Sequence, residues 1–254
     1  MPGDRYLIVN ADDFGQSHAV NRGVIAAHEH GIVTSASLMV RWPAAVEAAA
    51  YARDTRRLSV GLHFDFGEWA YRNDKWVALY EVVPPNDAEL ARAEVSRQLE
   101  AFLDLVGRSP THLDSHQHAH HSEPVRSILG GLARKLGIPL RARGRKIRYN
   151  GRFYGQDERG TPYPEAISVP GLLAILDTLP ACVTELGCHP SEANDLDTMY
   201  LSERPLELAT LCAPQIKRAI AERSIRLLSF HEVNSKRGSR EGDSNPHALA
   251  GSGF

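Results

Sequence analysis

The sequence predicts an α/β fold: a single-domain, distorted (β/α) barrel with about seven parallel strands, similar to a TIM barrel. Short apolar segments alternate along the chain with amphipathic segments of helical periodicity. The chain has 254 residues, 43% of them hydrophobic, which is enough for one domain with a full core. Polar side chains follow several of the apolar segments, and barrels of parallel strands collect their functional side chains at such strand ends.

The strands are expected where short apolar runs are bounded by turn residues. The first follows the N-terminus directly and leads into an acidic turn, and the third ends at Gly61-Leu62-His63. The fourth ends at Asp114, just before a cluster of histidines. The predicted strands cover residues 6–10, 35–40, 58–62, 112–114, 140–143, 182–187 and 226–230.

The helices are expected between these strands, where apolar residues recur at helical spacing. Gly31 and Gly137 are typical of helix C-termini, and Pro43 is typical of the start of a helix. The predicted helices cover residues 20–31, 43–54, 87–106, 124–136, 170–179 and 205–222. Residues 1–233 are thus expected to form one catalytic barrel domain.

Three segments fit neither pattern. Residues 64–85 are rich in aromatic side chains and aperiodic, which predicts a long functional loop. Residues 144–164 form a basic excursion rich in Tyr and Gly. Residues 234–254 are rich in Gly, Ser, Asn and Arg and can bury little, so we expect a flexible C-terminal tail.

The polar residues at the strand ends distinguish a barrel from a doubly wound sheet. Asp12 and Asp13 follow the first strand, and histidines or carboxylates follow the third, fourth, sixth and seventh. A barrel would bring all of them to one rim. A doubly wound nucleotide-binding sheet usually has a glycine-rich first turn, whereas residues 10–15 are acidic with a single glycine. The residues after the later strands are His63, Asp114, His116, His189 and His231.

An Asp and two His from separate strand ends could hold a divalent ion and leave coordination positions open for water and substrate, which suits hydrolysis. In the cluster at residues 112–121, at most one or two histidines need contact such an ion. A second carboxylate beside the ligand could accept a proton from water. Two alternatives remain: Asp12-Asp13 could be a solvated turn, and His63 could be an ordinary buried histidine. Arg141 either orients Asp12 or lies on a basic surface strand.

The composition of the chain excludes several classes of protein. The formal net charge of −2 gives no basic field for nucleic acid or anionic lipid. The three cysteines form no CxxC pair, which favours a reducing, cytoplasmic location, and Cys188 beside His189 is expected to be a core residue rather than a nucleophile. No signal-like or membrane-spanning apolar run is apparent.

Six sequence blocks in the same order resemble the YdjC-like carbohydrate deacetylases, the ChbG/HpnK group. They are Asn10–Gly15, Gly31–Ser35, Gly61–His63, Pro110–His118, Glu185–Pro190 and Arg204–Leu208. The resemblance implies a distorted seven-stranded barrel that removes N-acetyl groups from amino sugars with a divalent metal. It matches Asp13, His63 and His116 to the metal ligands, Asp12 to the general base and His189 to the general acid.

The resemblance leaves several roles open. Asp114 is expected to orient a neighbour, and His118 to face the substrate. The loops that carry Trp69 and Tyr154 differ from the family pattern; their rings would stack on a sugar or simply cover the barrel mouth. The cofactor is one divalent cation, Zn²⁺ or Mg²⁺, with Co²⁺ or Mn²⁺ also compatible, although two imidazoles favour zinc, cobalt or manganese over magnesium.

The sequence therefore predicts a metal-dependent N-deacetylase that acts on an amino sugar or oligosaccharide and releases acetate. Its expected partner is that N-acetylated sugar, with neither nucleic acid nor membrane, and a homodimer is left open. One alternative is a metal-dependent amidase or phosphoesterase with a non-sugar substrate. Another is a sugar-binding or metal-binding protein without catalysis, which the complete set of catalytic residues disfavours.

Overall fold

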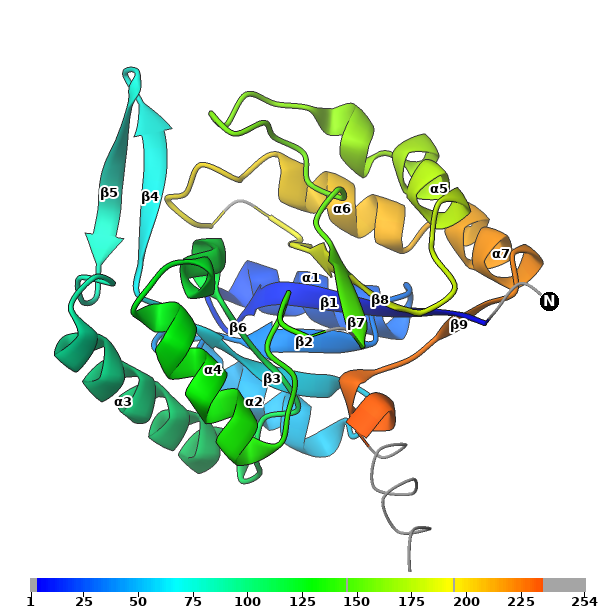
Figure 1. The fold of residues 1–254 in the computed structure, drawn as a ribbon. Coiled ribbons are helices and arrows are strands. Elements are labelled where there is room, and N and C mark those ends of the chain that lie inside the picture. Colours follow the sequence, from blue (N-terminus) through cyan, green and yellow to red (C-terminus); the bar gives the residue numbers. More distant parts are fainter. Residues whose placement is uncertain (1–3, 145, 194, 235–254) are drawn as a thin grey trace, which may run out of the picture.

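The structure is a computed structural model that describes residues 4–144, 146–193 and 195–234. Figure 1 shows a curved sheet in the centre of the molecule, with helices around its outer side. The predicted flexible tail, residues 234–254, lies outside the described residues except for Asn234. No helix within the described ranges is both long and apolar enough to cross a membrane.

The central sheet has seven strands, and all its pairings are parallel. Six strands follow the order β6-β3-β2-β1-β8-β7, and β9 pairs with the first residues of β1. Because β6 and β7 lie at the two ends of this order, the sheet is open rather than closed into a full barrel. It is a curled half-barrel, which confirms the predicted α/β fold class. The strands are β1 (Arg5–Phe14), β2 (Ser35–Leu38), β3 (Ser59–Phe64), β6 (Leu113–Ser115), β7 (Ile147–Asn150), β8 (Val183–Cys188) and β9 (Ile225–Leu227).

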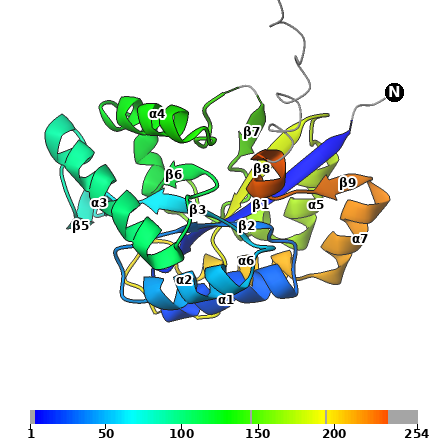
Figure 2. The same ribbon diagram turned by 90° about the horizontal axis from the view of Figure 1, so that it is seen from below.

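The helices form a partial ring outside the sheet. Neighbouring helices contact one another in the order α4, α3, α2, α1 and α6, and α5 contacts α7. Figure 2 shows α1 and α2 side by side along the outer side of the strands. The helices are α1 (His18–Glu29), α2 (Ala45–Asp54), α3 (Ala88–Val106), α4 (Val125–Leu136), α5 (Val169–Asp177), α6 (Glu203–Leu211) and α7 (Pro214–Glu222), with 3₁₀ helices η1 (His116–His121) and η2 (Pro164–Ile167).

Strand β1 forms the centre of the fold. From Leu7 to Phe14 every residue is buried, as expected for a parallel strand that is covered on both faces. Its polar end is buried with the rest: Asp12 is 3% exposed and Asp13 is 1% exposed. Burying two carboxylates requires compensating partners, so the end of β1 is where functional contacts are expected.

The predicted loop at residues 64–85 is wrong. This segment forms an antiparallel hairpin of β4 (Gly67–Arg72) and β5 (Lys75–Glu81), which projects from the body of the molecule in Figure 1. Asn73 and Asp74, between the strands, both have positive φ, the conformation of a tight two-residue hairpin turn. The Asn-Asp pair indicates this turn less strongly than Asn-Gly does. The aromatic residues hid the alternation of polar and apolar residues that is typical of a strand.

The predicted strand at residues 140–143 is also wrong. Leu140 makes only an isolated bridge to Leu113, and Ala142 has a φ of 55°, which ends any extended segment there. The strand forms instead at β7, inside the predicted excursion, where it pairs with β8. Arg141 therefore lies in a turn rather than on a strand.

The C-terminal part differs in two places. The predicted helix at 205–222 is two helices, α6 and α7, because Pro214 begins a new helix after the break. The predicted strand at 226–230 is limited to β9, and residues 230–234 form a helical segment. The His231 amide donates to Ser59 Oγ at the start of β3, so His231 lies at the opposite end of the strands from the other predicted residues.

Candidate active site

One cavity of about 520 Å³ lies at the C-terminal ends of the strands. Asp12 and Asp13 from β1, His63 from β3 and His189 just after β8 all line it. The structure therefore brings the residues of three separate sequence blocks to one place. Further predicted residues that line this cavity are Trp69, His116, His118 and Tyr154.

The backbone at the end of β1 lets two adjacent carboxylates face the same cavity. Pairing between β1 and β2 shifts register between Ala11 and Phe14, and Asp13 adopts a φ of 64°. Successive residues on a regular strand point to opposite faces. The irregularity explains why Asp12 and Asp13 both line the cavity, and a left-handed Asp of this kind is typical of functional sites.

Asp13, His63 and His116 form a compact group. One ligand atom of each lies within 4.8 Å of those of the other two, and all three residues are buried. Asp13 Oδ1 lies 3.4 Å from His63 Nε2 and 3.1 Å from His116 Nδ1. Arg204 donates to the other oxygen, Asp13 Oδ2, at 2.7 Å.

The electrostatic interactions in this group favour the charged forms of Asp13 and His63. Burial raises the pKa of Asp13, but Arg204 and His116 outweigh it and hold the pKa well below its usual value. Burial lowers the pKa of His63, yet Asp114 and Asp13 raise it to about 9. The group is thus held together by ion pairs between the carboxylate and the two imidazoles.

Asp114 fixes the orientation of His63. Its Oδ1 lies 2.8 Å from His63 Nδ1, and Ser37 Oγ donates to its Oδ2 at 2.6 Å. This leaves His63 Nε2 facing Asp13. Burial raises the pKa of Asp114, but Arg141 and His63 outweigh it and keep the carboxyl ionised.

Arg141 is fully enclosed and binds three carboxylates. It donates to both oxygens of Asp12, at 2.5 and 2.7 Å, and its NH2 group lies 2.8 Å from Asp114 Oδ2. Burial raises the pKa of Asp12, but Arg141 outweighs it and lowers the pKa. The remaining predicted alternative, an exposed basic strand, does not apply to Arg141, which is 2% exposed.

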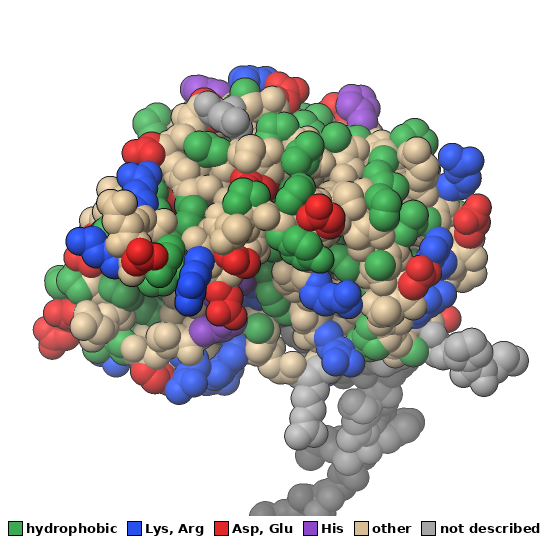
Figure 3. All heavy atoms as spheres, turned by 90° about the horizontal axis from the view of Figure 1, so that it is seen from above, with side chains coloured by type: hydrophobic (Ala, Val, Ile, Leu, Met, Phe, Trp, Pro, Cys, Tyr) green, Lys and Arg blue, Asp and Glu red, His purple; other side chains and the backbone are tan. Residues whose placement is uncertain are grey.

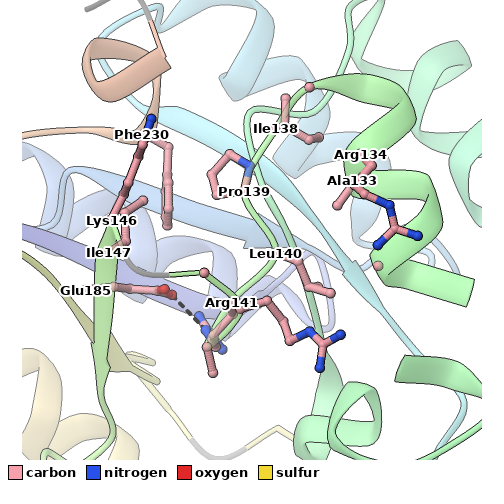
Figure 4. Close-up of a pocket in the computed structure, with 15 residues that line it drawn as sticks. Ala133, Arg134, Ile138, Pro139, Leu140, Arg141, Lys146, Ile147, Glu185 and Phe230 are labelled. Atoms are coloured by element: carbon pink, nitrogen blue, oxygen red, sulfur yellow. Dashed lines mark hydrogen bonds and ion pairs between the residues drawn. The ribbon is translucent and has the colours of Figure 1, made fainter. Parts of the chain in front are cut away.

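The third carboxylate on Arg141 belongs to Glu185 of β8. Arg141 Nε donates to Glu185 Oε1 at 2.7 Å, the contact drawn in Figure 4. Burial raises the pKa of Glu185 to about 7 despite Arg141. Both residues line a second cavity, of about 450 Å³, bordered by the turn after α4, the start of β7 and Phe230. Arg141 thus connects that cavity to Asp12.

His189 lies between the catalytic cavity and α6. Its Nε2 is 3.8 Å from Asp12 Oδ2, and its Nδ1 is 3.7 Å from Glu207 Oε1. Its backbone amide donates to Glu207, and its ring packs edge-on against Tyr154 at 5.6 Å. The side chain is 20% exposed, which makes it accessible to a substrate.

The hairpin and η1 hold each other at the cavity mouth. Gln117 Nε2 donates to the carbonyl of Trp69 at 2.8 Å, and the Trp69 amide donates to Gln117 Oε1 at 3.0 Å. Gln117 and His118 both have left-handed backbone conformations. Tyr149 lies beside His118, with its hydroxyl 3.5 Å from His118 Nε2.

Glu68 and Arg204 are among the site residues that were missed in the sequence. Glu68 on β4 is 3% exposed, and its Oε2 lies 3.4 Å from His116 Nε2. Arg204, which binds Asp13, begins one of the family-like blocks, so that block was the signal for it. Glu68 had no signal of its own, because the hairpin that places it was not predicted.

Cys188 is not part of the reactive surface. The thiol is fully buried and lies 3.4 Å from the Asn10 carbonyl, to which it donates. Burial raises its pKa well above the usual value, so the nucleophilic thiolate is disfavoured. The geometry agrees with a core role for this residue.

Comparisons with known proteins place this chain in a family. A chitooligosaccharide deacetylase from Serratia marcescens is 33% identical, covering 91% of this chain and all of that protein. A carbohydrate deacetylase from Geobacillus stearothermophilus is 32% identical over 90% of this chain and 98% of its own.

A solved structure is also similar. It is a protein from Enterococcus faecalis that is described as a cellobiose-phosphate cleavage protein. Its sequence is 27% identical and the TM-score is 0.71, and the match covers 91% of this chain and 99% of the Enterococcus chain. The profile of the YdjC-like protein family matches residues 6–222. The chain therefore belongs to the YdjC-like family.

Proposed function

We propose that this protein is a metal-dependent carbohydrate N-deacetylase that releases acetate from an N-acetylated amino sugar. The observation that carries the proposal is the convergence of Asp12, the Asp13-His63-His116 group and His189 in one cavity. The names of the deacetylase relatives support the substrate class. The proposal includes one divalent ion in the site.

The residues present fit such an ion. Ligands at about 2.0–2.2 Å from a tetrahedral zinc are roughly 3.3–3.5 Å from one another. The separations from Asp13 Oδ1, 3.4 Å to His63 Nε2 and 3.1 Å to His116 Nδ1, are close to that edge length. Asp114 and Glu68 contact the other ring nitrogens, as carboxylates commonly do behind metal-binding histidines. Asp13, His63 and His116 would hold the ion.

When bound, a divalent ion supplies a Lewis acid that polarises the acetyl carbonyl and makes water more acidic. Asp12 then accepts the proton of the attacking water. Its Oδ1 accepts from both Asn10 and Arg141, whereas Oδ2 accepts only from Arg141 among the hydrogen bonds of the described residues and faces His189. Oδ2 is therefore the oxygen placed to take the proton, and the lowered pKa keeps it ionised beforehand.

His189 completes the reaction. As the amide C–N bond breaks, protonated His189 donates a proton to the departing amine nitrogen, and the acyl group leaves as acetate. Glu207 supports the imidazolium from its far side, with Oε1 3.7 Å from His189 Nδ1. Trp69 and Tyr154 supply ring faces for the sugar, and His118 contacts it from the wall formed by η1.

The test is acetate release from a panel of N-acetylated mono- and oligosaccharides, measured with several divalent ions. We expect acetate from at least one amino sugar and none after chelation. A phosphoester and a non-sugar amide in the same panel separate the alternatives. Turnover of only those compounds would exclude the carbohydrate assignment, and sugar binding without any turnover would support the non-catalytic alternative.

A further inference from the structure

A second group of histidines lies beside the cavity, and of its members only His118 lines the cavity and has a role in the proposed reaction. His118, His120 and His121 each place one ring nitrogen within 4.8 Å of the other two. The rings of His118 and His121 are stacked, with centroids 5.1 Å apart and planes 9° from parallel. Gln117 and His118 interrupt the helical geometry of η1, so a regular 3₁₀ turn does not account for the alignment of these two rings.

Two nitrogens in this group have no hydrogen-bond partner among the described residues. His120 Nδ1 lies 2.7 Å from Ser115 Oγ, and His118 Nε2 faces the Tyr149 hydroxyl. The opposite atoms, His118 Nδ1 and His120 Nε2, are buried, and nothing in the part of the chain that the structure describes forms a hydrogen bond with them. An unsatisfied buried polar atom destabilises the folded protein, and a bound cation would remove that cost. The contact with Ser115 also fixes the ring of His120, as outer contacts of metal ligands do.

The backbone around the group is held in an uncommon conformation. Gln117 (φ 46°) and His118 (φ 54°) are consecutive left-handed residues, a strained conformation that persists only where the surrounding structure holds it. The two hydrogen bonds between Gln117 and Trp69 provide that fixation. His118 is thereby directed toward His121 rather than along the course of a regular helix.

We propose that His118, His120 and His121 form a second metal site that binds Zn²⁺. Three imidazoles without a carboxylate suit zinc and neighbouring transition metals and disfavour Mg²⁺, which requires oxygen ligands. Three protein ligands also leave a fourth position for water. His121 is exposed, which gives the ion a path from solvent, and His118 places the site at the wall of the catalytic cavity.

The test measures bound zinc after equilibrium dialysis of chelator-stripped protein. We expect about two ions per wild-type chain, one in the Asp13-His63-His116 group and one here. His121→Gln should lose the second ion, or weaken it at least about tenfold, because even outer-shell changes have effects of this size. His118→Gln should do the same. His30→Gln, which replaces another exposed histidine at the end of α1, is the control and should keep both ions.

The outcomes separate this proposal from the catalytic one. A single zinc ion in both the wild type and His121→Gln would overturn the second site without affecting the first. A second ion that His121→Gln and His118→Gln bind as tightly as the wild type would also overturn it, because the ion would then lie elsewhere. Dialysis against Mg²⁺ should fill at most the first site, and two bound Mg²⁺ ions would contradict the imidazole-only assignment.

Discussion

The two walls of the catalytic cavity are built differently. At the strand ends, Asp12, Asp13 and Asp114 are at most 3% exposed, and each is paired with a buried arginine. The opposite wall carries Trp69 and Tyr154, which are partly exposed and held by backbone contacts and ring stacking. The difference indicates that the reaction geometry is fixed by the sheet, whereas the shape of the substrate site is set by segments that can vary independently.

Loss of a strand-end ligand should have the largest effect. We expect His116→Ala to lower kcat/KM for deacetylation by at least about a thousandfold, because Lewis-acid stabilisation contributes several kcal/mol. The variant should also bind one zinc ion fewer than the wild type. His30→Gln is the control for both measurements. Near-normal turnover in purified His116→Ala would remove His116 from the catalytic centre.

Asp12→Asn should separate metal binding from proton transfer. The amide cannot accept the proton of water, so we expect kcat to fall by roughly 10²–10⁴-fold. Asp12 does not belong to the Asp13-His63-His116 group, so metal content should stay at the wild-type level. Acetate release at the normal rate would show that another group is the base.

Arg141 should matter more for folding than Glu185 does. Arg141→Ala leaves buried carboxylates without their cation, and breaking a buried pair of this kind costs about 3–5 kcal/mol. Glu185→Gln keeps an oxygen that can accept from Arg141 Nε, so thermal stability near that of the wild type is expected. Equal losses of melting temperature in the two variants would contradict this account of the network.

Metal binding to the strand-end group should be coupled to pH. The pKa of His63 is raised to about 9 in the metal-free protein, so at neutral pH its ring is protonated and must lose that proton to bind an ion. Affinity should therefore rise with pH up to about 9, by about tenfold per unit for each proton released. Calorimetry in buffers of different ionisation enthalpy measures the release, and a pH-independent affinity would contradict it.

The wall that carries Trp69 and Tyr154 should give the smallest effect. Trp69→Ala removes only the indole, because Gln117 binds the Trp69 backbone. We expect KM for the sugar to rise about tenfold, which corresponds to a loss of about 1.4 kcal/mol of binding, and kcat to change little. Tyr163→Ala, an exposed aromatic outside this cavity, is the control. An unchanged KM for Trp69→Ala would support a covering role for this ring instead.

The sequence predicted the strand-end wall well because local rules act there. The apolar run before Asp12 and the glycine before His63 mark buried strands, and parallel strands place their ends at one rim. The contact between Arg141 and Asp12 was anticipated, yet the element was not, since a left-handed Ala142 follows Arg141. The contact of Arg141 with Asp12 and the secondary structure around Arg141 thus depend on different features of the chain.

The contacts that other segments make with the strand ends could not be predicted because they are long-range. Glu68 reaches His116 only because an Asn-Asp turn closes a hairpin that looks aperiodic in the sequence. Arg204 binds Asp13 across 191 residues, and no local pattern specifies that pairing. The cluster at residues 112–121 shows both cases: His116 faces Asp13, whereas His118 is redirected by a strained backbone.

The most direct measurement is anomalous diffraction at the metal edge from crystals of protein that releases acetate. The central claim is that the ion required for turnover lies among Asp13, His63 and His116. The expected result is a strong anomalous peak bounded by the carboxylate of Asp13 and the two imidazoles, and its loss in His116→Ala. An active, metal-loaded crystal with no peak there would contradict the account.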